Sequence, residues 1–213
     1  MIRAEGLFRR YGRIEAVKAV SFAAGKGEVV GLLGQNGAGK TTIMNMLSGC
    51  IAPSAGRVEI MGHDLLARPG LAKRHLGYLP EVPPLYPEMT VMEYLRFVCD
   101  IKGVLRADRE DHIEEIIELA GLQEIKDRLT GMLSKGFAQR TGLAQALCGD
   151  PEVLLLDEPT AGFDPVQAVA FRKLIRKLSK DKVILISSHI LAELQAVCGR
   201  VLILHEGQLL LDY

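Results

Sequence analysis

The sequence has no excess of charge of either sign, because Lys and Arg together number 26 and so do Asp and Glu. Zero net charge argues against a nucleic-acid partner that is held by bulk electrostatics. Long apolar runs are also missing: no stretch approaches the length that spans a bilayer, and the N-terminus has no signal-peptide pattern. We therefore expect any connection to a membrane to run through another chain.

Cysteine is scarce and scattered. The four cysteines, at positions 50, 99, 148 and 198, form no metal-binding pair, which is typical of reduced thiols in a cytosolic protein. Apolar residues make up 48% of the 213 residues and charged residues 24%, an ordinary balance for a globular protein. This length predicts one large domain, residues 1–213, with room for subdomains.

A glycine-rich loop is the clearest motif. Residues 34–42 fit the pattern G-x-x-x-x-G-K-T, between the apolar run Val29–Leu33 and a segment suited to a helix. Glycines let the backbone turn tightly and bring its N–H groups against phosphates, and the helix adds the positive end of its dipole. Lys40 supplies a charge for the β- and γ-phosphates, and Thr41 a hydroxyl for Mg²⁺. The predicted nucleotide-binding residues are Gly34, Gln35, Asn36, Gly37, Ala38, Gly39, Lys40, Thr41 and Thr42.

The remaining apolar patterns predict an α/β fold with a mostly parallel sheet wrapped by helices. We expect an antiparallel β subdomain within about residues 1–28 and 53–75, including an edge strand over 57–60. A helical insert over about 88–148 should begin at the capping box Thr90–Glu93. Asp164 and Pro165 should open a later helix. The expected buried face of that helix is Val166, Val169, Ala170, Leu174 and Leu178.

Two carboxylates follow a predicted buried strand. Asp157, at the end of the run Val153–Leu156, is placed to hold Mg²⁺ next to the phosphate loop. Glu158 would then project toward the γ-phosphate, where a carboxylate can polarise an attacking water.

A third motif, Leu-Ser-Lys-Gly-Phe-Ala-Gln-Arg over residues 133–140, places a serine at the start of a predicted helix, which forms an anion site. It resembles the L-S-G-G-Q signature of the ATP-binding cassette (ABC) family, and its variant form resembles the ABC-2 exporter branch. The resemblance implies a P-loop NTPase core with a RecA-like sheet, and a signature that binds the γ-phosphate held by the opposite protomer. The signature residues are Ser134, Lys135, Gly136 and Phe137.

Further motifs of the same family follow in order along almost the whole chain. Tyr11 matches the aromatic residue that stacks on adenine, Asp164 matches the D-loop, and His189 matches the switch histidine that contacts the γ-phosphate. Glu81 departs from the pattern, because the family usually has glutamine there as an Mg²⁺ ligand and a link to the permease. A carboxylate can still bind Mg²⁺ through oxygen, so we expect Glu81 to keep the metal-binding role. Glu81 is also found in ABC-2 subfamilies that resemble drug-export, gliding-motility and copper-reductase-maturation ATPases.

Together the motifs predict a cytoplasmic ATP-binding and ATP-hydrolysing subunit, with ATP and Mg²⁺ as cofactors. It would lie on the inner face of the cell membrane and drive transport through a separate permease. A second ATP-binding subunit would complete a homodimer or heterodimer, and the resemblance favours export over import. A soluble ABC ATPase that acts on ribosomes or DNA is the alternative. Such proteins usually have two cassettes, a coiled coil or zinc-binding cysteines, and none of these is present. A sensor that binds nucleotide without hydrolysis would be expected to lack Glu158 or His189.

Overall fold

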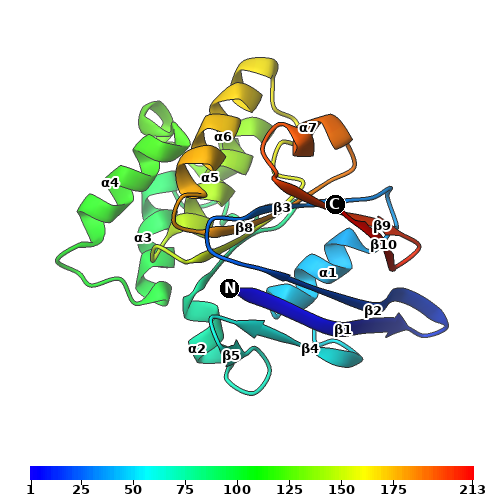
Figure 1. Ribbon diagram of the computed structural model, residues 1–213. Helices are drawn as coiled ribbons and strands as arrows, with labels where there is room; N and C mark the ends of the chain where they lie inside the picture. Colours follow the sequence, from blue (N-terminus) through cyan, green and yellow to red (C-terminus); the bar gives the residue numbers. More distant parts are fainter.

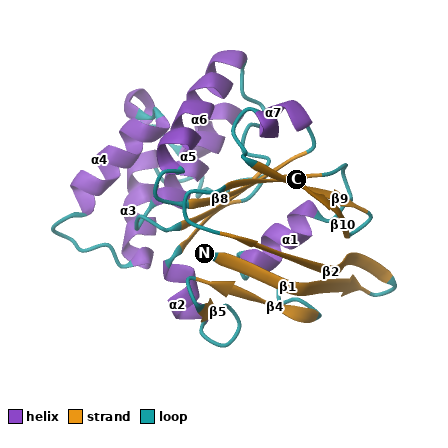
Figure 2. Cartoon of the chain, viewed as in Figure 1, coloured by secondary structure: helices purple, strands orange, loops and turns teal.

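The strands form two separate sheets in the computed structural model, which describes residues 1–213 (Figure 2). The larger sheet has the order β10-β9-β3-β8-β7-β6, and all its neighbours are parallel except the β9–β10 pair. Its strands are β3 (Val29–Leu33), β6 (Leu76–Leu79), β7 (Val153–Asp157), β8 (Val183–Ser188), β9 (Arg200–His205) and β10 (Gln208–Asp212). The smaller sheet is antiparallel and consists of β2 (Ile14–Ala24), β1 (Ile2–Tyr11), β4 (Ala55–Ile60) and β5 (His63–Asp64).

The helices cover the large sheet from both sides (Figure 1). One group, α3 to α6, gathers on one side, whereas α1 lies between the two sheets. None of the helices is long and apolar enough to cross a bilayer. The helices are α1 (Lys40–Leu47), α2 (Pro69–Arg74), α3 (Val91–Lys102), α4 (Arg109–Ala120), α5 (Lys135–Leu147), α6 (Pro165–Leu178) and α7 (Leu191–Gln195), with short 3₁₀ turns at Gln123–Ile125 and Thr130–Met132.

Alternation along the central strands divides the hydrophobic core into two clusters. In β7, Val153 and Leu155 face α1 and the small sheet, whereas Leu154 and Leu156 face the helices of the insert. Strand β8 divides its side chains in the same way. Because side chains of a strand alternate between the faces of a sheet, a strand buried on both faces must be apolar throughout. The large sheet is therefore a rigid base for the loops at its edge.

Polar caps begin the long helices where the sequence predicts them. Thr90 accepts a hydrogen bond from the Glu93 N–H and forms a complete capping box at α3. Ser134 caps α5, and Asp164 forms a capping box with Gln167 at α6. These predictions are confirmed.

The predicted buried face of α6 is wrong in most of its members. Val166 and Val169 are 79% and 45% exposed, and the buried residues are Phe171, Ile175 and Leu178. The true apolar stripe is shifted by one residue, about 100° around the helix. The predicted face missed Phe171, which packs edge-to-face against Phe163 and joins the core below α6. The prediction of an edge strand over residues 57–60 is wrong, because β4 lies between β1 and the two-residue strand β5, which forms the edge instead.

Candidate functional site at the phosphate loop

A cleft of about 590 Å³ opens where the central strands end. In the parallel ladder, Leu33 of β3 pairs with Ser188 of β8, and Asp157 of β7 pairs with Ser187. The loops that follow these three strands must therefore emerge side by side, which is the usual place for a ligand in such sheets. The cleft has the size of a small-molecule site. Its lining residues are Tyr11, Ala16, Asn36, Gly37, Gly39, Lys40, Thr41, Thr42, Glu81, Glu158, Ala161 and His189.

The phosphate loop can be built only with glycine at two of its positions. Gly39 has φ +104°, and a Cβ there would lie 2.7 Å from the Ala16 carbonyl oxygen. A Cβ on Gly34 would come within 2.8 Å of the Leu204 carbonyl oxygen. The loop curls around Lys40, whose Nζ donates to the carbonyl oxygens of Gly34 at 2.7 Å and Gln35 at 3.3 Å. Two backbone carbonyl oxygens of the loop thus hold the ammonium group of Lys40 in place.

Asp157 lies directly beneath the cleft and is fully buried. Its Oδ1 accepts a hydrogen bond from the Ser187 hydroxyl, whereas Oδ2 is buried without a partner. Burial raises the pKa of Asp157, and the hydrogen bond from the Ser187 hydroxyl and the nearby Thr41 hydroxyl offset part of this increase. The nearby carboxylate of Glu81 raises the pKa further. An unpartnered, desolvated carboxylate oxygen beside a threonine hydroxyl is suited to a cation.

Glu158 and His189 both line the cleft and contact each other. His189 Nδ1 lies 3.0 Å from Glu158 Oε2, and Lys40 Nζ lies 3.5 Å from Glu158 Oε1. Glu158 has a positive φ of 46°, which is uncommon for a residue with a side chain. Its N–H donates to the Ser187 hydroxyl at 2.9 Å, which fixes this backbone conformation. The strained turn directs the carboxylate toward Lys40.

Tyr11 stands at the rim of the cleft, at the end of β1. The guanidinium of Arg9 lies over one face of the tyrosine ring, 4.7 Å from the centroid, and Arg9 also donates to the Ala52 carbonyl at 2.8 Å. The ring is 45% exposed. It can therefore offer its other face to a planar ligand.

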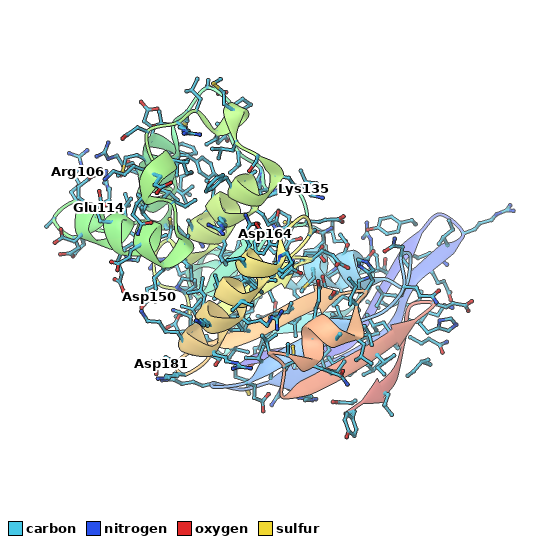
Figure 3. All side chains as sticks on the ribbon, turned by 90° about the horizontal axis from the view of Figure 1, so that it is seen from above. Arg106, Glu114, Lys135, Asp150, Asp164 and Asp181 are labelled. Atoms are coloured by element: carbon cyan, nitrogen blue, oxygen red, sulfur yellow. The ribbon has the colours of Figure 1, made fainter.

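The predicted signature residues lie outside this cleft. Ser134, Lys135, Gly136 and Phe137 form the first turn of α5, and Asp164 starts α6 beside it; Figure 3 shows Lys135 and Asp164 together at the same ends of their helices. A Cβ on Gly162 would lie 2.9 Å from the Lys135 side chain, so this turn packs against the loop before α6. The structure thus divides the predicted site into two separate groups.

Most of the other predicted site residues come together in the cleft, and four do not line it: Asp157, which lies beneath it, and three residues of the phosphate loop. Gly34, Gln35 and Ala38 shape the phosphate loop without lining the cleft. Ala16, Ala161 and Ser187 were missed by the sequence analysis. Ser187 had a usable signal, because a polar residue at the end of a buried strand next to the Asp157 strand must face the same edge.

The charges of the cleft do not balance those of a triphosphate. Lys40 is the only lysine or arginine that lines the cleft, whereas Glu81 and Glu158 contribute two carboxylates and Asp157 lies below. The side chains of the cleft therefore leave much of the charge of such a ligand unbalanced, and a cation or further donors would complement Lys40 and the loop N–H groups.

The chain is similar to known proteins over nearly its whole length. A sequence profile described as "ABC transporter" matches residues 17–161. The YxlF ABC transporter ATP-binding protein of Bacillus subtilis is 39% identical, over 98% of this chain and 69% of the relative. The bacitracin transport ATP-binding protein BcrA of Bacillus licheniformis is also 39% identical, over 99% of this chain and 68% of the relative.

A solved structure of the ATP-binding subunit of an ABC transporter is 30% identical and matches with a TM-score of 0.92, over 100% of this chain and 89% of that one. The relatives do not favour a soluble ABC ATPase that acts on ribosomes or DNA. The fold is that of the P-loop ABC cassettes, as the sequence predicted. The chain belongs to the ABC transporter family, as an ATP-binding and ATP-hydrolysing subunit.

Proposed function

We propose that the cleft is the hydrolytic site, with Glu158 as general base. The observation that carries this proposal is the position of the Glu158 carboxylate, held between Lys40 at 3.5 Å and His189 at 3.0 Å. A carboxylate fixed at both oxygens is suited to accept a proton from an attacking water. Lys40 and the loop N–H groups would bind the phosphates of ATP. Tyr11 would stack on the adenine ring, and His189 would contact the γ-phosphate.

Mg²⁺ is the cation that we propose for the floor of the cleft. The donor set consists of oxygen atoms only, from Thr41, Asp157 and Glu81, and such a set suits Mg²⁺. The buried, unpartnered Oδ2 of Asp157 supports this fit. When bound, the ion neutralises charge that develops on the phosphates. Glu81 takes part here although the family usually has glutamine.

A second ATP-binding subunit would complete the site. The first N–H groups of a helix have no partner within the helix, so the N–H groups of Lys135 and Gly136 are free to bind an anion. These donors lie outside the cleft of their own chain, and that cleft lacks positive charge. A head-to-tail pair, with each signature turn facing the other chain's phosphate loop, supplies what is missing.

The permease is the remaining partner, and a groove of about 340 Å³ beside the Glu81 loop supports its docking. Pro80 and Pro84 line this groove on either side of Glu81, which itself lines the nucleotide cleft. Lys73 and Lys102 also line it, and neither has a carboxylate within 4 Å; burial lowers the pKa of Lys102. Large apolar side chains are exposed in the same segments: Leu71, Val82, Tyr86, Ile101 and Leu105.

This combination of apolar side chains and unpaired cations suits an amphipathic cytoplasmic segment of the permease that carries a carboxylate. The loop around Glu81 would then transmit changes between nucleotide and permease. We further propose that the permease is of the ABC-2 exporter type, because the bacitracin transport relative and the variant signature agree with that branch. This chain would lie on the inner face of the cell membrane, held there by the permease. In this proposal residues 1–213 act as one ATP-binding domain, with the small sheet and the helical insert as its subdomains.

Replacement of the proposed base tests the hydrolytic role. Glu158→Gln keeps the shape of the side chain but cannot accept the proton, so ATP hydrolysis should fall by about 100-fold or more while ATP still binds. The dimer should accumulate with ATP, as measured by light scattering after size-exclusion chromatography. A variant that turns over at the wild-type rate would show that Glu158 is not the base.

Asp157→Asn tests the metal site. Because the pKa of Asp157 is raised, its ionised form lowers the stability of the folded protein at neutral pH. Without metal, the variant should therefore unfold at a higher temperature, by about 2–4 °C for each kcal/mol added to the free energy of unfolding. This gain should shrink as the pH is lowered through the raised pKa, where the wild-type carboxyl becomes protonated. The stabilisation by Mg²⁺ and ATP in thermal melts should be lost. Asp181→Asn, at the far end of α6 (Figure 3), is the control, and equal Mg²⁺ effects in both variants would contradict the site.

Charge reversal tests the docking groove. Lys73→Glu places a negative charge in the groove, where it should repel the proposed carboxylate of the permease. We expect at least about 10-fold weaker copurification with the permease, loss of permease-stimulated hydrolysis, and unchanged basal hydrolysis. Lys180→Glu, which lies outside the groove, is the matched control. Copurification of Lys73→Glu at the wild-type level would remove the groove from the interface.

A further inference from the structure

One carboxylate outside the cleft connects the two loops that carry Glu158 and His189. Glu193 lies in α7, and its Oε2 accepts hydrogen bonds from the hydroxyls of Thr160 and Ser188, each at 2.9 Å. Thr160 follows Glu158 by two residues, and Ser188 immediately precedes His189. A single oxygen atom therefore joins the loop after β7 to the end of β8, next to His189.

The Ser188 hydroxyl extends this network across the histidine. It donates to Glu193 and accepts from the Ile190 N–H at 3.1 Å, so the residues on both sides of His189 are fixed. The Thr160 end fixes the start of the loop that leads to Asp164. The network lies against a small cavity of about 80 Å³ between α6 and α7, lined in part by Phe171, Ile186 and Leu194.

We propose that Glu193 is a positioning residue for ATP hydrolysis, which sets the distance between Glu158 and His189 through Thr160 and Ser188. This inference rests on the proposed roles of Glu158 and His189. An apolar environment strengthens hydrogen bonds, and two hydroxyls that share one acceptor oxygen cannot shift independently. The 3.0 Å contact between His189 Nδ1 and Glu158 Oε2 spans the two loops that this oxygen connects.

A role in the stability of α7 alone does not explain these contacts. Helix α7 has only five residues, and the hydrogen bonds that Glu193 Oε2 accepts come from side chains of other elements rather than from backbone N–H groups of α7. A negative charge in the first turn of a helix is favourable, but it acts through the charge and does not require a shared oxygen. Replacement of the carboxylate by an uncharged group that still has an acceptor oxygen should therefore preserve a positioning role and abolish a role that depends on charge.

Two substitutions separate these roles. Glu193→Ala removes the shared acceptor, and misplacement of catalytic groups by about 1 Å can cost about 100-fold in rate. We expect kcat for ATP to fall by about 10- to 100-fold while KM changes by less than about threefold. Glu193→Gln keeps an acceptor oxygen but loses the charge, so kcat should stay within about threefold of wild type. Thr160→Val combined with Glu193→Ala should be no slower than the slower single variant, because both remove the same connection.

The steady-state ATPase assay should include Glu158→Gln and thermal melts of every variant. Loss of activity in both Glu193→Ala and Glu193→Gln would assign the effect to charge and overturn the positioning role. A normal kcat for Glu193→Ala, with Glu158→Gln inactive, would also overturn it while leaving the proposed base in place. Normal turnover of Glu158→Gln would instead refute the proposed hydrolytic roles. A fall in kcat in proportion to a lower unfolding temperature would show a merely structural role.

Discussion

The parallel register of the central sheet is the constraint on which the site depends. Because β3, β7 and β8 run in the same direction in adjacent positions, Leu33, Asp157 and Ser188 lie at one edge, and the loops that follow must meet there. The chain is apolar on both faces of these strands, so the edge cannot shift without exposing the core. The phosphate loop, Asp157, Glu158 and His189 are thus placed by strand register first and by their own hydrogen bonds second, whereas Tyr11 comes from the small sheet.

The parts of the site that phosphate chemistry requires could be predicted from the sequence. Binding phosphates needs glycines, a lysine and a hydroxyl within a few residues, and a motif that short is visible in the chain. Contacts between distant segments left little signal: Glu193 lies in a helix of five residues, and its partners are 33 and 5 residues away. The buried face of α6 was predicted wrongly because the spacing of apolar residues within the helix does not show that Phe171 packs against Phe163, which lies outside the helix.

The side chains of the cleft carry more negative than positive charge, and this imbalance points to additional groups at the nucleotide site. One lysine faces two carboxylates, with a third buried below, so the side chains of the cleft do not neutralise the charge of a triphosphate. A divalent cation and the free N–H groups at the start of α5 would both correct the deficit, and the latter have to come from another chain. Because each chain would supply only part of the phosphate site, we propose that bound nucleotide favours closure of the two chains. The loop around Glu81 joins this cleft to the lysine-lined groove. We propose that this loop would link closure of the two chains to the permease.

We propose that each complete site is shared between two chains, and complementation of two inactive variants is the sharpest test of this sharing. Lys40→Ala disables the phosphate loop, and Gly136→Asp places a negative charge in the signature turn. A mixed dimer would retain one complete site, built from the phosphate loop of the Gly136→Asp chain and the signature of the Lys40→Ala chain. If the site is shared, the mixture of the two variants should hydrolyse ATP although neither variant does so alone. A mixture as inactive as its components, with mixed dimers shown to form, would contradict the shared site.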